Sequence, residues 1–230
     1  MIPLRDDAPR TTTPYVNYFL IALNVAVFLF EIQLTPSGLM AFVRDFGFVP
    51  AHVSNFARGG AGYALPAFVP VFTSMFIHAS WLHIIFNMWA LWIFGDNVED
   101  SLGHFRYLVF YFISGIAASA LHYVFNATSA EPSVGASGAI AGVMGAYFLL
   151  FPSARVLTFF FVFFTWLPAW LVLGYWFVVQ FLSGAATSIA ATKQTTGVAF
   201  WAHVGGFIAG VTMIKIFPRR APRYRFNTWN

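Results

Sequence analysis

Long apolar stretches separated by short polar connectors constrain this chain more than any other feature. A helix needs about 20 mostly apolar residues to cross the hydrocarbon core of a bilayer. Only 9% of the residues are charged, against about 25% in soluble domains. The pattern predicts an all-α membrane protein, a bundle of six transmembrane helices. The expected spans are residues 15–34, 81–95, 105–125, 136–151, 161–182 and 198–217.

The connectors predict a simple domain organisation. Residues 1–14 are polar and are followed by an apolar run too long for a cleavable signal peptide. Residues 15–217 would form the transmembrane domain, in which a segment at about 35–80 mixes apolar and charged residues and is expected to lie at the membrane interface. Residues 218–230 form a basic tail.

Basic residues are unevenly divided between the two sides of such a bundle. Six spans put both termini on one side, and the positive-inside tendency then places both termini in the cytoplasm. The net charge of +4 is therefore interpreted as a topology signal rather than as nucleic-acid affinity. The terminal side carries Arg5, Arg10, Arg106, Arg155, Lys215, Arg219, Arg220, Arg223 and Arg225. The other side carries Arg44, Arg58 and Lys193.

Polar residues inside apolar spans are costly and indicate function. Ser137 and His203 each lie 15 residues before a proline that ends their span, Pro152 and Pro218. At 1.5 Å per residue both lie about 22 Å above the terminal side. His83 and Asn87, on another parallel span, fall at a comparable depth. One outward-opening pocket could hold all of these side chains.

Small residues predict that the helices carrying Ser137 and His203 touch. Gly138 and Gly142 on one, and Gly206 and Gly210 on the other, form small-xxx-small patterns that let backbones approach closely.

A serine and a histidine at equal depth suggest hydrolytic chemistry. A neutral imidazole can accept the serine proton near pH 7. Ser137 opens a helix, whose free N–H groups would stabilise a developing oxyanion, and His83 and Asn87 could add donors. No acid falls in the expected pocket, so a Ser–His dyad is expected. The alternatives are that Ser137 merely caps its helix and that His203, His83 and Asn87 are interhelical hydrogen bonders.

Metal chemistry is disfavoured by the same residues. The chain has no cysteine, and His78 and His83 stand without a third ligand nearby, whereas zinc normally takes three or four.

At these residues the sequence resembles the rhomboid family. The matching stretches lie in order between about residues 72 and 210: Phe72–His78, His83-Ile-Ile-Phe-Asn87, Val98–Arg106, Gly135-Ala-Ser137-Gly-Ala-Ile-Ala-Gly142 and Ala202-His203-Val-Gly-Gly206.

The resemblance implies an intramembrane serine protease that cleaves single-pass membrane proteins near the outer membrane face and uses no metal or cofactor. It implies that Ser137 is the nucleophile, His203 the base, and His83 and Asn87 oxyanion ligands. The region from Trp176 to Gly197 would gate substrate entry. Where some relatives stack a tyrosine beneath the histidine, this chain has Ala141, and a Trp–Arg pair of the first loop is missing.

Two other functions compete with proteolysis. A catalytically inactive scaffold or quality-control factor should lack Ser137 or His203, and both are present. A small transporter should show intramembrane acids or inverted repeats, and none is evident. The short termini suggest a bacterial plasma membrane. The sequence does not indicate the oligomeric state.

Overall fold

The computed structural model describes residues 1–60, 65–66, 68–189 and 199–220, and these residues are mostly helical. Lys193, Arg223, Arg225, most of the basic tail and the start of the sixth expected span lie outside the described residues. The helices are α1 (Tyr15–Glu31), α2 (Pro36–Phe46), α3 (Pro50–Ala57), α4 (Val69–Thr73), the 3-10 turn η1 (Ser74–Phe76), α5 (Trp81–Leu102), α6 (His104–Asn126), α7 (Ser137–Leu150), α8 (Ala169–Ile189) and α9 (Phe200–Met213). The strands are β1 (Ile2–Asp6), β2 (Arg155–Phe160) and β3 (Phe163–Pro168).

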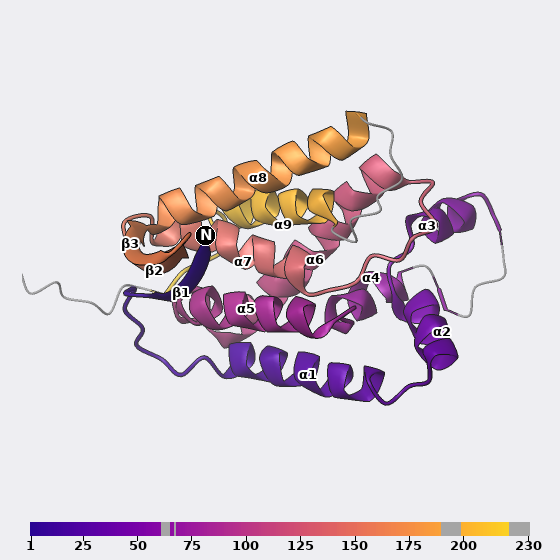
Figure 1. The fold of residues 1–230 in the computed structure, drawn as a ribbon, viewed down its shortest axis with the longest axis horizontal. Helices are drawn as coiled ribbons and strands as arrows, with labels where there is room; N and C mark the ends of the chain where they lie inside the picture. Colours follow the sequence, from indigo (N-terminus) through magenta and orange to yellow (C-terminus); the bar gives the residue numbers. More distant parts are fainter. Residues whose placement is uncertain (61–64, 67, 190–198, 221–230) are drawn as a thin grey trace, which may run out of the picture.

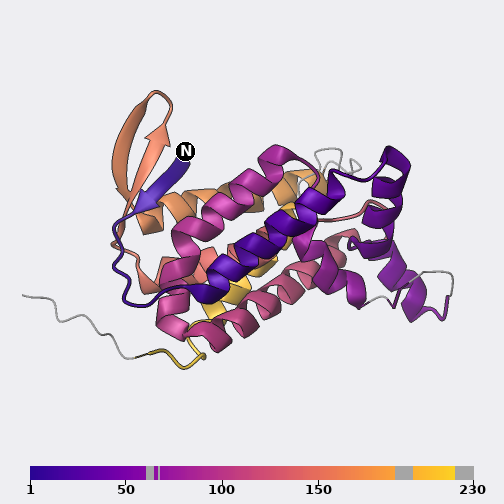
Figure 2. The same cartoon turned by 90° about the horizontal axis from the view of Figure 1, so that it is seen from below.

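The long helices α1, α5, α6, α7, α8 and α9 run side by side as one bundle (Figures 1 and 2). Helices α2 and α3 lie at one end of the bundle, within the segment expected at the interface. The strands lie at the opposite end, together with Met1 (Figure 1). The backbone N–H of Arg220 donates to the Ser101 carbonyl at the end of α5. Both ends of the described chain therefore lie on one side, as the sequence predicts.

Two of the described helices, α6 and α8, are long and apolar enough to cross a membrane, and the bent pair formed by Val69–Phe76 and α5 would make a third. Helices α1, α7 and α9 are apolar but have only 17, 14 and 14 residues. The length criterion alone thus supports two or three spans within the described ranges.

A three-stranded antiparallel sheet, in the order β1-β2-β3, corrects the expectation of an all-α fold. Residues 161–168, expected to begin the fifth span, form the hairpin turn and β3, and α8 starts only at Ala169. Aromatic and β-branched residues dominate both hairpin strands and favour a pleated conformation. The turn places Phe161 at φ 54°. Apolar content alone did not distinguish this hairpin from a spanning helix.

Helix α5 continues past the acidic cluster that was expected to end it. Gly103, with φ 83°, terminates the helix instead. The fully buried Glu99 carboxylate accepts the backbone N–H groups of Val16 and Asn17 at 3.0 and 2.7 Å. These N–H groups belong to the first turn of α1, where no intrahelical acceptor exists. The acidic residue therefore caps a neighbouring helix, which explains why it lies inside α5.

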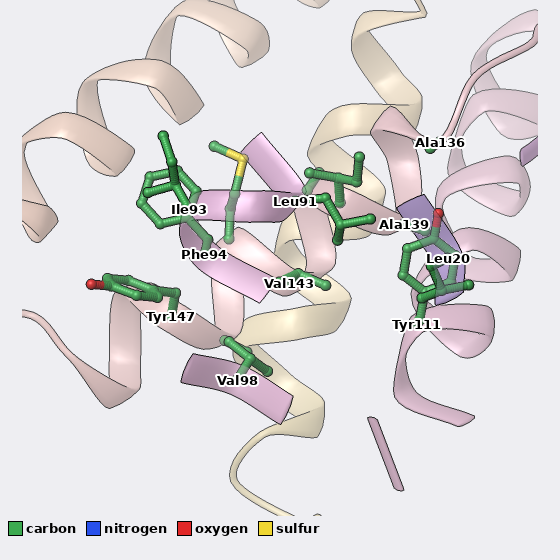
Figure 3. Packing of buried hydrophobic residues seen from close by; sticks show 14 of the residues in the cluster. Leu20, Leu91, Ile93, Phe94, Val98, Tyr111, Ala136, Ala139, Val143 and Tyr147 are labelled. Atoms are coloured by element: carbon green, nitrogen blue, oxygen red, sulfur yellow. The ribbon is translucent and has the colours of Figure 1, made fainter. Parts of the chain in front are cut away.

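Helices α7 and α9 form the centre of the bundle and pack backbone against backbone. A methyl group added at Gly206 or Gly210 would overlap the carbonyl oxygen of Gly138 or Gly142. The predicted close contact between the helices carrying Ser137 and His203 is confirmed. Around it, side chains from different helices interdigitate, including Leu20, Leu91, Phe94, Val143 and Tyr147 (Figure 3).

Candidate active site

Ser137 is the first residue of α7 and is half-buried. The preceding Gly135 has φ 124°, a conformation that L residues with side chains rarely adopt. Its N–H donates to the Ser74 carbonyl at 2.8 Å, which ties the turn to η1. The Ser137 hydroxyl points to a histidine and does not cap the helix, since the N-cap residue is Ala136 and makes no side-chain cap.

His203 lies one turn into α9 and is 9% exposed. Its Nε2 is 2.7 Å from Ser137 Oγ, so the two residues that the sequence placed at equal depth are in hydrogen-bond contact. Its Nδ1 is 2.7 Å from Gln180 Oε1 on α8. The Trp176 ring, one turn earlier on α8, lies 5.7 Å from the imidazole between centroids. Sequence reasoning placed both residues in the gating region and missed their contact with His203. An uncharged but strongly polar glutamine in an otherwise apolar helix was the available signal.

His83 and Asn87 lie one turn apart on α5 and face the turn before Ser137. A Cβ placed on Gly135 would stand 2.6 Å from His83 Nε2 and 3.6 Å from Asn87 Nδ2. Only glycine therefore allows the imidazole to approach this backbone. Asn87 is 7% exposed, and its Nδ2 has no hydrogen-bond partner. A buried, unpaired donor is rare and calls for a functional explanation.

A cavity of roughly 540 Å³ joins these four side chains. Leu82, Phe86 and Trp89 of α5 line it and are 66, 53 and 44% exposed, so the rim on this helix is apolar. Trp176 lines it from α8. Among the described residues that line it there is no carboxylate. Met1 and the β1 residues Ile2 and Pro3 also line it.

The other histidines do not line this cavity. His78 packs its ring 5.0 Å from that of His83, and its backbone N–H lies 3.2 Å from the buried Glu31 carboxylate. His104 pairs with Glu99 across 2.5 Å at the other end of α5. His122 lies within reach of Asn126 on α6. In the described ranges no three histidine or acidic side chains gather as a metal site would require.

The expected gating region is described only in part. Trp176 to Ile189 belong to α8, whereas residues 190–197 lie outside the described residues.

A hydroxyl and an imidazole in contact, inside a cavity with a free amide donor, can support acyl transfer. The imidazole can accept the serine proton. Charge that develops on a bound carbonyl can be met by Asn87 and by the free N–H groups at the start of α7.

Comparison with known proteins finds a family model and relatives that all carry the rhomboid name. The family model for the Rhomboid domain matches residues 66–220. Rhomboid protein 1, mitochondrial, of Saccharomyces cerevisiae is 36% identical over 148 residues, which are 62% of this chain and 40% of that protein. The presenilin-associated rhomboid-like protein, mitochondrial, of Homo sapiens is 28% identical over 214 residues, 89% of this chain and 48% of the relative. This chain thus spans less than half the length of the relatives it matches.

The names of these relatives correct one expectation. A bacterial plasma membrane, with the termini in the cytoplasm, was expected, but both proteins are mitochondrial, as is RHOMBOID-like protein 6 of Arabidopsis thaliana. The bacterial placement rested on short termini, which carry no information about the compartment. Because the family model covers most of the chain and contains every candidate site residue, the chain belongs to the rhomboid family.

Proposed function

We propose that this protein is an intramembrane serine endopeptidase that hydrolyses peptide bonds of membrane-anchored proteins through Ser137 and His203. The observation that carries the proposal is the 2.7 Å contact between Ser137 Oγ and His203 Nε2, beside a cavity into which buried polar groups project. A serine hydroxyl becomes an effective nucleophile when an adjacent base takes its proton.

The proposed reaction follows from this pair. Ser137 Oγ attacks the scissile carbonyl carbon while its proton moves to His203 Nε2. The protonated imidazole then gives that proton to the leaving amine, and the C–N bond breaks to leave an ester on Ser137. Water, deprotonated by the same nitrogen, hydrolyses the ester and restores the hydroxyl.

The oxyanion would form between α5 and the start of α7. Asn87 Nδ2 is an unpaired donor next to Gly135, and the N–H of Ser137 has no intrahelical partner because it opens a helix. His83 presents its Nε2 to the same turn. Donors that are in place before reaction stabilise charge without reorganisation.

We further propose six spans, with the substrate entering from the side. Helices α7 and α9, at about 21 Å each, are too short to cross alone, but they are buried at the centre of the bundle. Non-helical backbone is tolerated at membrane depth where protein or a water-filled cavity surrounds it. The apolar rim of α5, facing Trp176 of α8 across the cavity, suits a transmembrane segment. The mitochondrial relatives support a mitochondrial membrane as the location.

A fluorophosphonate probe tests the catalytic assignment. Attack by Ser137 forms a P–O bond and releases fluoride, and His203 accepts the proton. Wild-type protein should be labelled, with the adduct on the peptide that contains residue 137, and it should cleave a single-pass model substrate in liposomes. Ser137→Ala and His203→Ala should do neither. Ser133→Ala, four residues earlier in the loop that precedes α7, is the matched control and should behave like wild type.

Two outcomes contradict the proposal. Labelling of Ser137→Ala at the wild-type level would place the nucleophile elsewhere. A folded wild-type protein that neither reacts with the probe nor cleaves, yet captures membrane proteins, would be the inactive scaffold instead.

A further inference from the structure

The imidazole of His203 is held from both sides. Ser137 occupies its Nε2, and Gln180 Oε1 lies 2.7 Å from its Nδ1. Trp176 packs against the ring from the same helix as Gln180. Figure 1 shows this helix, α8, running beside α9. Both groups that support the imidazole therefore come from α8.

The chemistry of a neutral imidazole defines what Gln180 does. Nε2 can accept the serine proton only if it carries a lone pair, so the single ring proton must lie on Nδ1. An Nδ1–H needs an acceptor, and the amide oxygen of Gln180 is at hydrogen-bond distance. In the other tautomer Nε2 would carry the proton and donate to Ser137 Oγ, so it could not accept the serine proton, and Nδ1 would lose its hydrogen bond to Gln180 Oε1. The Gln180 contact thus selects the tautomer in which His203 can act as a base.

In serine proteases with a triad, a buried carboxylate accepts a hydrogen bond from Nδ1–H and orients the ring. A carboxylate in an apolar helix would carry the large cost of burying a charge, whereas an amide is neutral and costs far less. The neutral amide stabilises the protonated ring less than a carboxylate would, but it still orients the ring and selects its tautomer.

We propose that Gln180 is a positioning residue that holds His203 in the reactive tautomer. Because Gln180 belongs to α8, catalysis then depends on where α8 lies relative to α9. The inference rests on the proposed function. Helix α8 also lines the cavity through Trp176. A displacement of α8 that widens the entrance would withdraw the Nδ1 acceptor, so the fully active base forms only when α8 packs against α9.

Gln180→Met tests the inference because methionine matches the shape of glutamine and offers Nδ1–H only a weak thioether acceptor. Hydrogen bonds to groups that become charged contribute about 1.5–3 kcal/mol, which corresponds to a rate loss of about 10- to 150-fold. We expect that loss in kcat, with KM for a single-pass substrate changed less than about twofold. Gln180→Glu retains an acceptor and should recover most of the rate per molecule of folded protein, the measure that separates catalysis from the cost of a buried carboxyl group. Gln33→Met, at an exposed glutamine bonded to the Leu29 carbonyl, is the control and should match wild type.

The fluorophosphonate probe separates positioning from a structural role. It is too small to need the lateral entrance, yet its reaction needs the same base. Gln180→Met should therefore slow labelling and substrate cleavage by the same factor, with an unchanged melting temperature. Unaltered labelling with slowed cleavage, or a loss in Gln180→Glu equal to that in Gln180→Met, would overturn the inference while leaving Ser137 as nucleophile. A wild-type protein without labelling would defeat the proposed function itself.

Discussion

Replacing Asn87 by alanine should separate catalysis from stability. Asn87 and Asn97 are both buried on α5, at 7 and 1% exposure. The Asn87 Nδ2 has no partner, whereas the Asn97 Nδ2 donates to the carbonyls of Ala8 and Pro9 at 3.2 and 3.1 Å. The same substitution at the two positions removes a free donor in one case and a paired donor in the other.

The expected magnitudes follow from these contacts. Loss of one oxyanion donor typically lowers the rate by about 100- to 1000-fold, or about 2.7–4 kcal/mol. Asn87→Ala also removes a buried unpaired donor that costs about 1–3 kcal/mol, which offsets the lost packing and leaves the melting temperature unchanged or higher. Asn97→Ala breaks two hydrogen bonds of about 1 kcal/mol each. At about 2–4 °C per kcal/mol, its melting temperature should fall by about 4–8 °C.

Both variants would be compared with wild type in liposomes for cleavage of a single-pass substrate, per molecule of folded protein. Melting would be followed in detergent. Asn87→Ala should lose activity and keep its stability, and Asn97→Ala should do the reverse. Wild-type cleavage by Asn87→Ala would remove this residue from the oxyanion site. Loss of activity in proportion to loss of folded protein would show that its role is structural.

Three further perturbations test the packing, the capping and the sheet. Gly206→Ala would drive a methyl group into a backbone carbonyl of α7 and should lower the free energy of unfolding by about 1–3 kcal/mol and remove most activity. The control Gly174→Ala, where the added methyl group would have its nearest atom 3.8 Å away, should be neutral. Equal melting temperatures of the two variants would refute the contact. Glu99→Gln leaves one acceptor oxygen for two N–H groups of α1 and should lower stability by about 1–3 kcal/mol in thermal melts. In β1, burial raises the pKa of Asp6 above 3.8, although the Tyr147 hydroxyl donates to the carboxylate and opposes the shift. The stabilisation from protonating Asp6 is complete below pH 3.8 and is lost as the pH rises through the folded-state pKa. Asp6→Asn should therefore melt higher than wild type at pH 7, with a flatter profile from pH 4 to 7, and a lower melting temperature at pH 7 would contradict this assignment.

Much of the candidate site could be predicted from the sequence because its members lie at fixed positions along helices. Helical rise converts the distance of Ser137 and His203 from their prolines into a common depth, and the glycine spacing indicates which helices touch. Gln180 escaped prediction because the rotation of α8 about its axis, which determines what a side chain faces, is not encoded in any spacing along the chain. The conformation of Gly135 and the unpaired state of Asn87 likewise depend on neighbours distant in sequence.

The sequence by itself determined that this chain belongs in a membrane, where most of the helices lie, and which serine and histidine meet. Hydrophobic length and small-residue spacing are local properties, so they can be read without coordinates. Only the tertiary structure decided that the Phe-rich segment before α8 is a hairpin paired with β1, because strand pairing depends on a partner about 150 residues away. It also decided that support for His203 comes from α8, since a buried hydrogen bond forms wherever packing brings donor and acceptor together.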